Sequence, residues 1–231
     1  MTTSEFPVPS GPQVIPRPEL WELGGLSPWW HLDDRSLRLE DVETAIRGRK
    51  PSKKQGVLSD KDKQDTAVLV SLCGDKDPHV ILTRRSATLR FHKREMSFPG
   101  GKIEVSDPNL WFTACREASE ETGLITDELS LLGCLDPHIT ATSNSVIHPY
   151  VTVLGGWPDL TPNLNEVEVI RYVPLSELVN NRVWREEIWN TPMGIITVTF
   201  FVLDGDTVWG ATAAILRQLL SLSLDVPDND Y

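Results

Sequence analysis

The stretch of residues 101–124, GKIEVSDPNLWFTACREASEETGL, constrains the fold of this 231-residue chain more than any other part of the sequence. It predicts a helix over residues 108–122 with both ends marked. Asp107 can cap the first turn, and Pro108 suits the first helical position. Gly123 suits the position just past the end, where the backbone turns left-handed. The segment therefore specifies one central helix with a defined start and end.

Three glutamates gather on one face of this predicted helix. Glu117, Glu120 and Glu121 stand at positions i, i+3 and i+4, so their carboxylates share one turn and repel each other. Divalent cations would relieve that repulsion, because Mg²⁺ and Mn²⁺ prefer oxygen ligands. Upstream, the glycines of the turn at residues 98–101 (FPGG) let the backbone approach a metal or a phosphate closely. A solvated acidic face is the alternative interpretation of the glutamates alone.

The rest of the pattern predicts strands with a few helices, of the α/β or α+β class with a mixed sheet. Residues 66–73 and 79–83 are apolar, β-branched runs separated by GDKDP, which predicts a hairpin. Residues 96–103 predict a strand, a turn and a second strand. Further strands are predicted near residues 130–136, 148–154, 166–173 and 196–203, and helical segments at residues 36–48, 174–178 and 210–222.

The first thirty residues contain six prolines, at positions 7, 9, 12, 16, 18 and 28. This density excludes regular helix and predicts an extended arm, laid on the body through Trp21, Trp29 and Trp30. The arm has neither the apolar core of a secretory signal nor the arginine-rich, acid-free character of a transit peptide. The expected organisation is a Pro/Trp-rich arm at residues 1–35, a short helix and charged linker at 36–65, the main domain at 66–223 and an acidic tail at 224–231.

Charge and composition exclude several classes of function. The chain carries 22 Lys and Arg against 33 Asp and Glu, a net charge of −11, which opposes general binding to nucleic acid or to an anionic membrane. Its apolar runs are too short for a membrane-spanning helix. Cys73, Cys115 and Cys134 are too few and too scattered for a disulfide framework, so we expect buried free thiols in a reducing compartment.

The helix and its glycines resemble the Nudix box of the Nudix hydrolases. The matching residues are Gly101, Asp107, Arg116, Glu117, Ala118, Glu120, Glu121, Gly123 and Leu124. An aspartate as the first acid, and eight residues between Asp107 and Arg116, depart from the common pattern but also occur in the coenzyme A pyrophosphatase-like subfamily. The resemblance implies a Nudix fold, a mixed β-sheet sandwiched between helices, here with a Pro-rich N-terminal extension.

Residues 81–101, ILTRRSATLRFHKREMSFPGG, resemble the segment that marks the coenzyme A-type Nudix proteins. Arg94 stands where that family has glycine. Arginine would be strained there if the position needs a positive φ; if the glycine leaves room for substrate, arginine would fill that room or add a phosphate contact. Six basic residues within 84–94 suit phosphate recognition, although alternation along a strand prevents all six from meeting one ligand.

The resemblance also implies roles for individual residues. The predicted ligands of Mg²⁺ or Mn²⁺ are Glu117, Glu120, Glu121, the carbonyl of Gly101, and Asp107, for which a helix-cap role is equally open. Four catalytic residues are predicted. Glu120 is the first choice of base and Glu166 is the alternative base. The other two are Glu117 and Arg116, and Arg116 would hold the carboxylates through ion pairs. The predicted substrate-binding residues are Arg85, Arg90, His92, Arg94 and Lys102.

The implied activity is Mg²⁺- or Mn²⁺-dependent hydrolysis of the diphosphate of coenzyme A and its acyl derivatives. The products would be 4′-phosphopantetheine, or its acyl form, and adenosine 3′,5′-bisphosphate. Two alternatives stay open: a Nudix hydrolase for ADP-ribose, NADH or a dinucleotide, and a non-catalytic Nudix-fold binding module. The expected partner is a small nucleotide rather than nucleic acid or a membrane, and both a monomer and a homodimer are compatible with the sequence. We expect a cytoplasmic protein, with mitochondria, where relatives are placed, as the alternative.

Overall fold

The computed structural model describes residues 6–51, 64–140 and 145–228. Its elements are, in chain order, β1 (Trp21–Leu23), α1 (Leu39–Ile46), β2 (Gln64–Cys73), β3 (His79–Arg85), β4 (Met96–Ser97), β5 (Gly100–Lys102), α2 (Leu110–Thr122), β6 (Gly133–Cys134), β7 (His138–Ile139), β8 (Ser145–Val153), β9 (Val167–Pro174), α3 (Leu175–Leu178), β10 (Trp184–Thr191), β11 (Gly194–Leu203), β12 (Asp206–Trp209) and α4 (Gly210–Ser223). Most of the predicted charged linker and the end of the predicted acidic tail lie outside the described residues.

The larger sheet confirms the mixed sheet that the sequence predicts. Among the described residues it has eight strands in the central order β4-β3-β2-β8-β6, with β5, β7 and β9 attached to β2, β8 and β3. The pairing of β2 with β8 is parallel, and the other pairings are antiparallel. The predicted hairpin of β2 and β3 is present. β2 is buried over most of its length, as expected for a strand with both faces covered.

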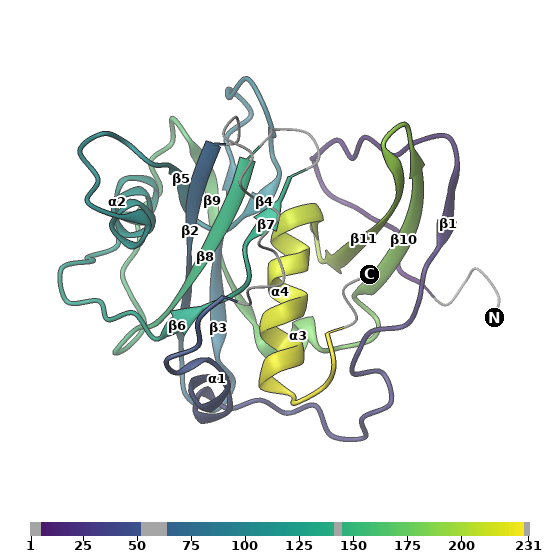
Figure 1. Cartoon of the computed structure of the whole chain (residues 1–231), viewed down its shortest axis with the longest axis horizontal. Coiled ribbons are helices and arrows are strands. Elements are labelled where there is room, and N and C mark those ends of the chain that lie inside the picture. The colour runs from purple at the N-terminus through teal and green to yellow at the C-terminus, as the bar shows by residue number, and fades with distance from the viewer. Residues whose placement is uncertain (1–5, 52–63, 141–144, 229–231) are drawn as a thin grey trace.

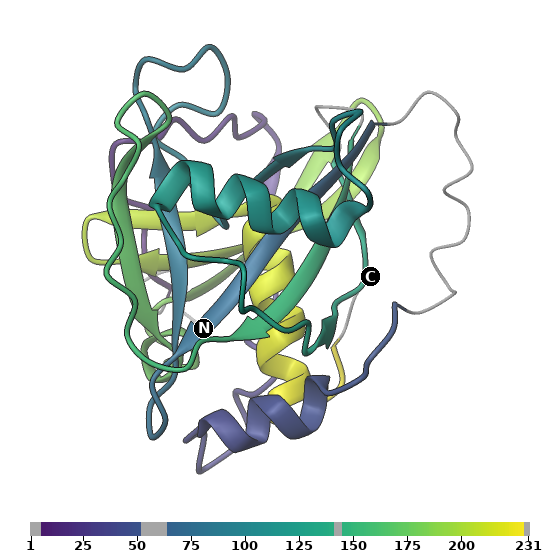
Figure 2. The same cartoon turned by 90° about the vertical axis from the view of Figure 1, so that its left-hand side faces the viewer.

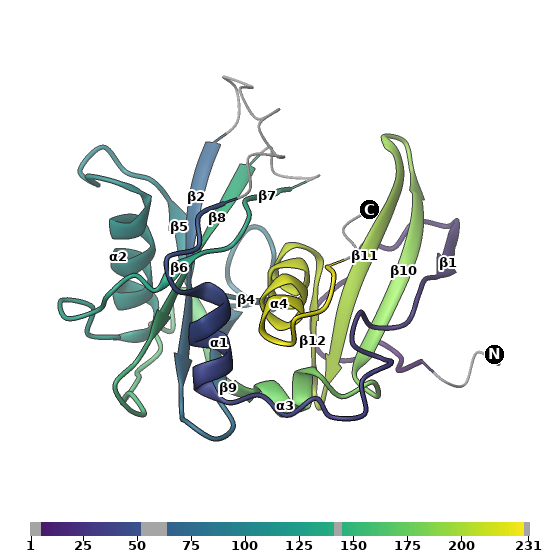
Figure 3. The same cartoon turned by 60° about the horizontal axis from the view of Figure 1, so that its bottom comes forward.

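Helices cover both faces of this sheet (Figures 1 and 2), which confirms the predicted sandwich. α2 lies on one face, where Ala118 belongs to the same buried cluster as Leu69 of β2. α4 lies on the opposite face with α1 beside it (Figure 3). Leu216 of α4 and Val70 of β2 are fully buried there in the main core. α2 lies over β2 and β5, and its Glu117 lies against Gly101 of β5.

A second, four-stranded sheet, β1-β10-β11-β12, packs on the other side of α4 (Figure 1). Of this sheet, the sequence predicts only the strand at residues 196–203. β10 was missed because its sequence, WREEIWNT, buries charged side chains: Arg185 and Glu187 are 6% and 0% exposed. Glu187 is paired with Arg185 at 2.6 Å and with Arg17 of the N-terminal arm at 2.7 Å. The predicted arm therefore lies against this second sheet and supplies its edge strand β1.

The arm also contributes Trp29 to the core. The Trp29 side chain is 0% exposed and lies edge-on to Trp184, with ring centroids 5.3 Å apart. We expect Trp29→Ala to lower the free energy of unfolding by about 3–5 kcal/mol, because it leaves a large cavity. Trp30 is 53% exposed, so Trp30→Ala is the matched control and should change that free energy by about 0.5 kcal/mol or less. Equal losses on chemical denaturation of the two variants would contradict this assignment.

The start of the central helix was predicted wrongly, and its end correctly. α2 begins two residues after Pro108, and its N-cap is Asn109, whose side chain accepts a hydrogen bond from a first-turn amide. Asp107 is therefore not the cap. Gly123 is the C-cap with a φ of 71°, which confirms the predicted left-handed end. Asn109 and Asp107 are both good capping residues, so sequence alone does not choose between them.

Three smaller predictions also have clear outcomes. The strand expected near residues 130–136 is reduced to β6. The two strands expected within residues 96–103 are present as β4 and β5, which pair with β3 and β2. Cys73 and Cys115 are buried free thiols as predicted, and burial raises the pKa of each to about 11, whereas Cys134 is only half-buried. In the described ranges, no helix is both long enough and apolar enough to cross a bilayer.

Candidate active site

α2 presents its three glutamates to very different surroundings. The side chain of Glu120 is 57% exposed, that of Glu117 is 15% exposed and that of Glu121 is 3% exposed. Burial raises the pKa of Glu117, and it raises the pKa of Glu121 to about 8. One helical turn therefore holds a solvent-facing carboxylate, a partly covered one and a buried one.

Two glycines of β5 allow this strand to lie very close to both α2 and β2. A Cβ on Gly101 would overlap the carboxylate of Glu117, and a Cβ on Gly100 would overlap the backbone of β2 at Ala67 and Val68. Neither glycine has a positive φ, so both are required for space rather than for an unusual conformation. The sequence predicts a close approach of this turn to a metal or a phosphate; the group that lies against Gly101 in the structure is a carboxylate of the protein. A metal contact of the Gly101 carbonyl stays a prediction.

Arg116 joins the carboxylates, in the role that the family resemblance implies. Its guanidinium donates hydrogen bonds to three of them: Asp107 at 3.0 Å, Glu117 at 3.0 Å and Glu120 at 3.1 Å. It also donates to the backbone carbonyl of Lys102, at the end of β5, at 3.2 Å. A single planar cation thus connects α2, β5 and the loop between them.

Asp107 is an internal partner of Arg116. Its side chain is fully covered, and its Oδ2 also accepts from the Thr113 hydroxyl at 2.9 Å and from the Glu104 amide at 3.0 Å. Hydrogen bonding to Arg116 lowers the pKa of Asp107 to about 2. A metal-ligand role for Asp107 stays a prediction, but these contacts favour a role in holding Arg116. Thr113 was not identified from the sequence, because a single hydroxyl on a helix gives no pattern.

Arg85 reaches the glutamates from β3. Its Nη1 lies 4.0 Å from Oε1 of Glu121. The preceding residue, Arg84, faces the opposite side of the sheet and pairs with Asp206 at 3.0 Å, as the predicted alternation requires. Nε of Arg85 and Oε2 of Glu121 are buried and have no hydrogen-bond partner among the described residues. Buried polar atoms without a partner are rare in native structures, and a bound ion or an ordered water molecule would satisfy them.

Glu166, the alternative base, lies near Glu117 and Glu121 of α2. Its negative charge contributes to the raised pKa of both Glu117 and Glu121. Its backbone carbonyl accepts a hydrogen bond of 2.7 Å from the amide of Ser86. The loop that precedes β9 is therefore tied to the end of β3, which brings Glu166 beside the glutamates of α2.

The chemistry of the carboxylates suits a divalent cation. Hard cations take oxygen ligands, the glutamates supply them, and one buried oxygen of Glu121 is open. As the side chains stand, no three Asp, Glu, His or Cys residues within the described ranges form a ready metal site. Oxygens of Glu117 and Glu120 are instead directed to Arg116. A bound cation would compete with Arg116 for these two carboxylates.

The other four predicted substrate-binding residues are exposed: Arg90, His92, Arg94 and Lys102. The first three belong to the loop between β3 and β4, where the guanidinium of Arg90 lies 5.2 Å from the ring centroid of Phe91. The carboxylate of Glu95, 3.0 Å from His92, raises the pKa of that histidine. These side chains are exposed to solvent, and their substrate contacts stay predictions.

Arg94 has a φ of 58°, in the left-handed region. The structure therefore supports the first explanation for the family glycine, a backbone that favours glycine. We expect Arg94→Gly to raise the free energy of unfolding by about 0.5–1 kcal/mol, since relief of left-handed strain exceeds the entropy that glycine adds to the unfolded chain. Lys93→Gly is the control, because Lys93 has no positive φ, and it should be neutral or destabilising. Urea denaturation decides, and lower stability of Arg94→Gly would contradict the expectation.

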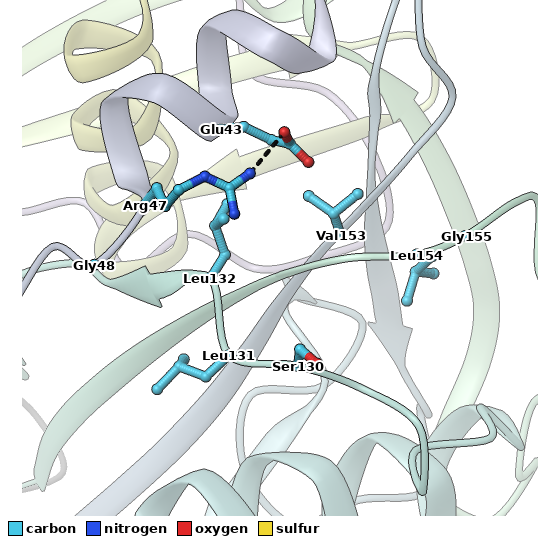
Figure 4. A pocket seen from close by; sticks show the side chains of 9 residues that line it. All are labelled: Glu43, Arg47, Gly48, Ser130, Leu131, Leu132, Val153, Leu154 and Gly155. Carbon is cyan, nitrogen blue, oxygen red and sulfur yellow. Dashed lines mark hydrogen bonds and ion pairs between the residues drawn. The ribbon is translucent and has the colours of Figure 1, made fainter.

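A groove of about 430 Å³ lies at the C-terminal end of β8 (Figure 4). The groove is lined by Glu43 of α1, by Arg47 and Gly48 just after this helix, and by the segments 130–132 and 153–155. An ion pair of 2.8 Å joins Glu43 to Arg47. β5 pairs with the first half of β2, which pairs in turn with the first half of β8. The groove is therefore separate from the carboxylates, and none of the predicted site residues lines it.

Comparisons with known proteins identify the family. Among solved structures, a MutT/nudix family protein from Enterococcus faecalis has a TM-score of 0.48 and 17% identity, covering 71% of this chain and 63% of that one. "Nudix hydrolase 22, chloroplastic" of Arabidopsis thaliana is 38% identical over 171 residues, covering 70% of this chain and 56% of that protein. "Uncharacterized Nudix hydrolase NudL" of Photorhabdus laumondii is 34% identical over 162 residues, covering 70% of this chain and 86% of that protein. A family model described as NUDIX domain matches residues 63–192, and together with the Photorhabdus laumondii relative this match shows that the chain belongs to the Nudix hydrolase family.

Proposed function

We propose that the protein is a Mg²⁺- or Mn²⁺-dependent hydrolase of the diphosphate in coenzyme A and its acyl derivatives. The observation that carries the proposal is the contact of 4.0 Å between Arg85 and Glu121. Arg85 belongs to the segment that resembles the coenzyme A type, and Glu121 belongs to the Nudix box, so the two sequence features meet in one site. The exposed basic loop between β3 and β4 is available for a second phosphate, such as the 3′-phosphate of coenzyme A.

The side chains would divide the work between them. Glu117, Glu120 and Glu121 would hold the cation, which when bound neutralises a diphosphate and lowers the pKa of a water molecule. Glu120 is the most exposed of the three and would take the proton from the attacking water, with Glu166 as the alternative base. Arg116 would keep the carboxylates in register through its hydrogen bonds.

The test is a substrate panel with purified protein and Mg²⁺, with products resolved by chromatography. We expect 4′-phosphopantetheine and adenosine 3′,5′-bisphosphate from coenzyme A, the corresponding acyl product from acetyl-coenzyme A, and no turnover in excess EDTA. Turnover of ADP-ribose, NADH or a diadenosine polyphosphate, but not of coenzyme A, would overturn the substrate assignment. Absence of turnover for every compound would contradict an enzyme and favour a Nudix-fold binding module.

A further inference from the structure

A β-bulge interrupts the pairing of β3 with β9 at Arg85, the last residue of β3. β3 and β9 pair regularly up to Arg84, and the register then shifts so that Arg85 pairs with Val167 and Glu168 is left as an extra residue. A bulge bends its strand and changes the direction of nearby side chains, and bulges are frequent beside active sites. The bulged segment leads directly back to Glu166, which precedes β9. The backbone therefore fixes the end of β3 and this loop as one unit.

The surroundings of Arg85 differ from those of a residue that waits for a phosphate in solvent. Only 28% of its side chain is exposed, and its Nε is buried. Its guanidinium faces Glu121, which is 3% exposed and which also experiences the charges of Glu117 and Glu166. Once Glu121 is ionised, as a ligand of a divalent cation must be, its buried carboxylate lies among like charges and needs a cation close by, because loss of one partner of a buried pair leaves an uncompensated charge.

We propose that Arg85 is a positioning residue, which holds the buried carboxylate of Glu121 in place from β3 and does not bind the phosphates of the substrate. This inference rests on the proposed metal-dependent hydrolysis, and it changes the role that the family resemblance implies for Arg85. If Arg85 acts through Glu121, its loss affects the metal and the rate of reaction. If it binds a phosphate, its loss affects the affinity for substrate.

The experiment compares Arg85→Ala, Arg85→Lys and wild type, with Arg47→Ala as the control. Arg47 is 65% exposed and lies on the separate groove, so its loss removes an equal charge far from the glutamates. For Arg85→Ala we expect Mn²⁺ affinity, measured by electron paramagnetic resonance without substrate, and kcat each to fall by roughly 10–100-fold. KM should change by less than about threefold. Arg85→Lys keeps the charge and should recover a large part of both losses.

Several outcomes would overturn the inference. One is a KM raised about tenfold with kcat and Mn²⁺ affinity unchanged, which would identify Arg85 as a substrate ligand. Another is a folded Arg85→Lys variant, checked by circular dichroism, that is no better than Arg85→Ala. The Mn²⁺ titration separates this inference from the proposed function. If the wild type turns over no substrate, the proposed function fails, while an unchanged Mn²⁺ affinity in Arg85→Ala would reject the positioning role.

Discussion

Replacement of Glu120 with glutamine is expected to lower kcat by at least about 100-fold while the fold stays intact. Removal of a general base or of a carboxylate that orients water costs about 10²–10⁴ in rate. The Glu120 side chain is 57% exposed and is held by one hydrogen bond of 3.1 Å from Arg116. An exposed pair of this kind contributes about 0–1 kcal/mol to stability, so the Tm should hardly change.

The control for this variant is Glu128→Gln. Glu128 is exposed in the turn that follows α2, so its replacement removes the same charge at a position outside the cluster of glutamates on α2. We expect wild-type kcat for Glu128→Gln in the coenzyme A assay. Near-normal turnover of Glu120→Gln would remove Glu120 from the mechanism and move the search for the base to Glu166.

The central helix shows how far local sequence signals extend. The glutamate spacing and Gly123 correctly predict a helix and its end, because both depend on contacts within one or two turns. The start fails because Asp107 is drawn to Arg116, a contact between residues nine positions apart in sequence. β10 fails for a related reason, since the charges it buries are compensated by Arg17, 170 residues away. Charge pairs of this range leave no periodic signal.

The sequence names the residues of the candidate site, but it does not predict their arrangement. The family resemblance correctly implies that Arg116 binds the carboxylates, and the alternation of a strand correctly separates Arg84 from Arg85. The spacing of the glutamates does not distinguish exposed Glu120 from buried Glu121. That difference depends on β5, the end of β3 and the loop before β9, which cover one side of the helix. Those segments meet through long-range pairing, so local periodicity cannot reveal which glutamate is exposed and which is buried.

Replacement of Glu121 with glutamine is expected to stabilise the metal-free protein at alkaline pH. Burial raises the pKa of Glu121 from 4.5 to about 8, so between these values the folded chain holds a proton that the unfolded chain has lost. Stability of the wild type should therefore fall as pH rises through this window. Glutamine has nearly the same size and cannot ionise. At pH 9 in EDTA we expect Glu121→Gln to be more stable by roughly 2–4 kcal/mol, with little difference at pH 5.

The same variant should lose Mn²⁺ affinity and turnover, because the carboxylate that destabilises the metal-free fold is one that a divalent cation would use. Thermal unfolding of both proteins from pH 5 to pH 9, with and without Mn²⁺, measures the two effects together. Mn²⁺ should raise the stability of the wild type most at high pH, because the cation binds the folded state and needs an ionised ligand. Parallel stability curves for wild type and Glu121→Gln in EDTA would show that Glu121 does not ionise in this window. Equal stabilisation of both by Mn²⁺ would show that the cation binds without it.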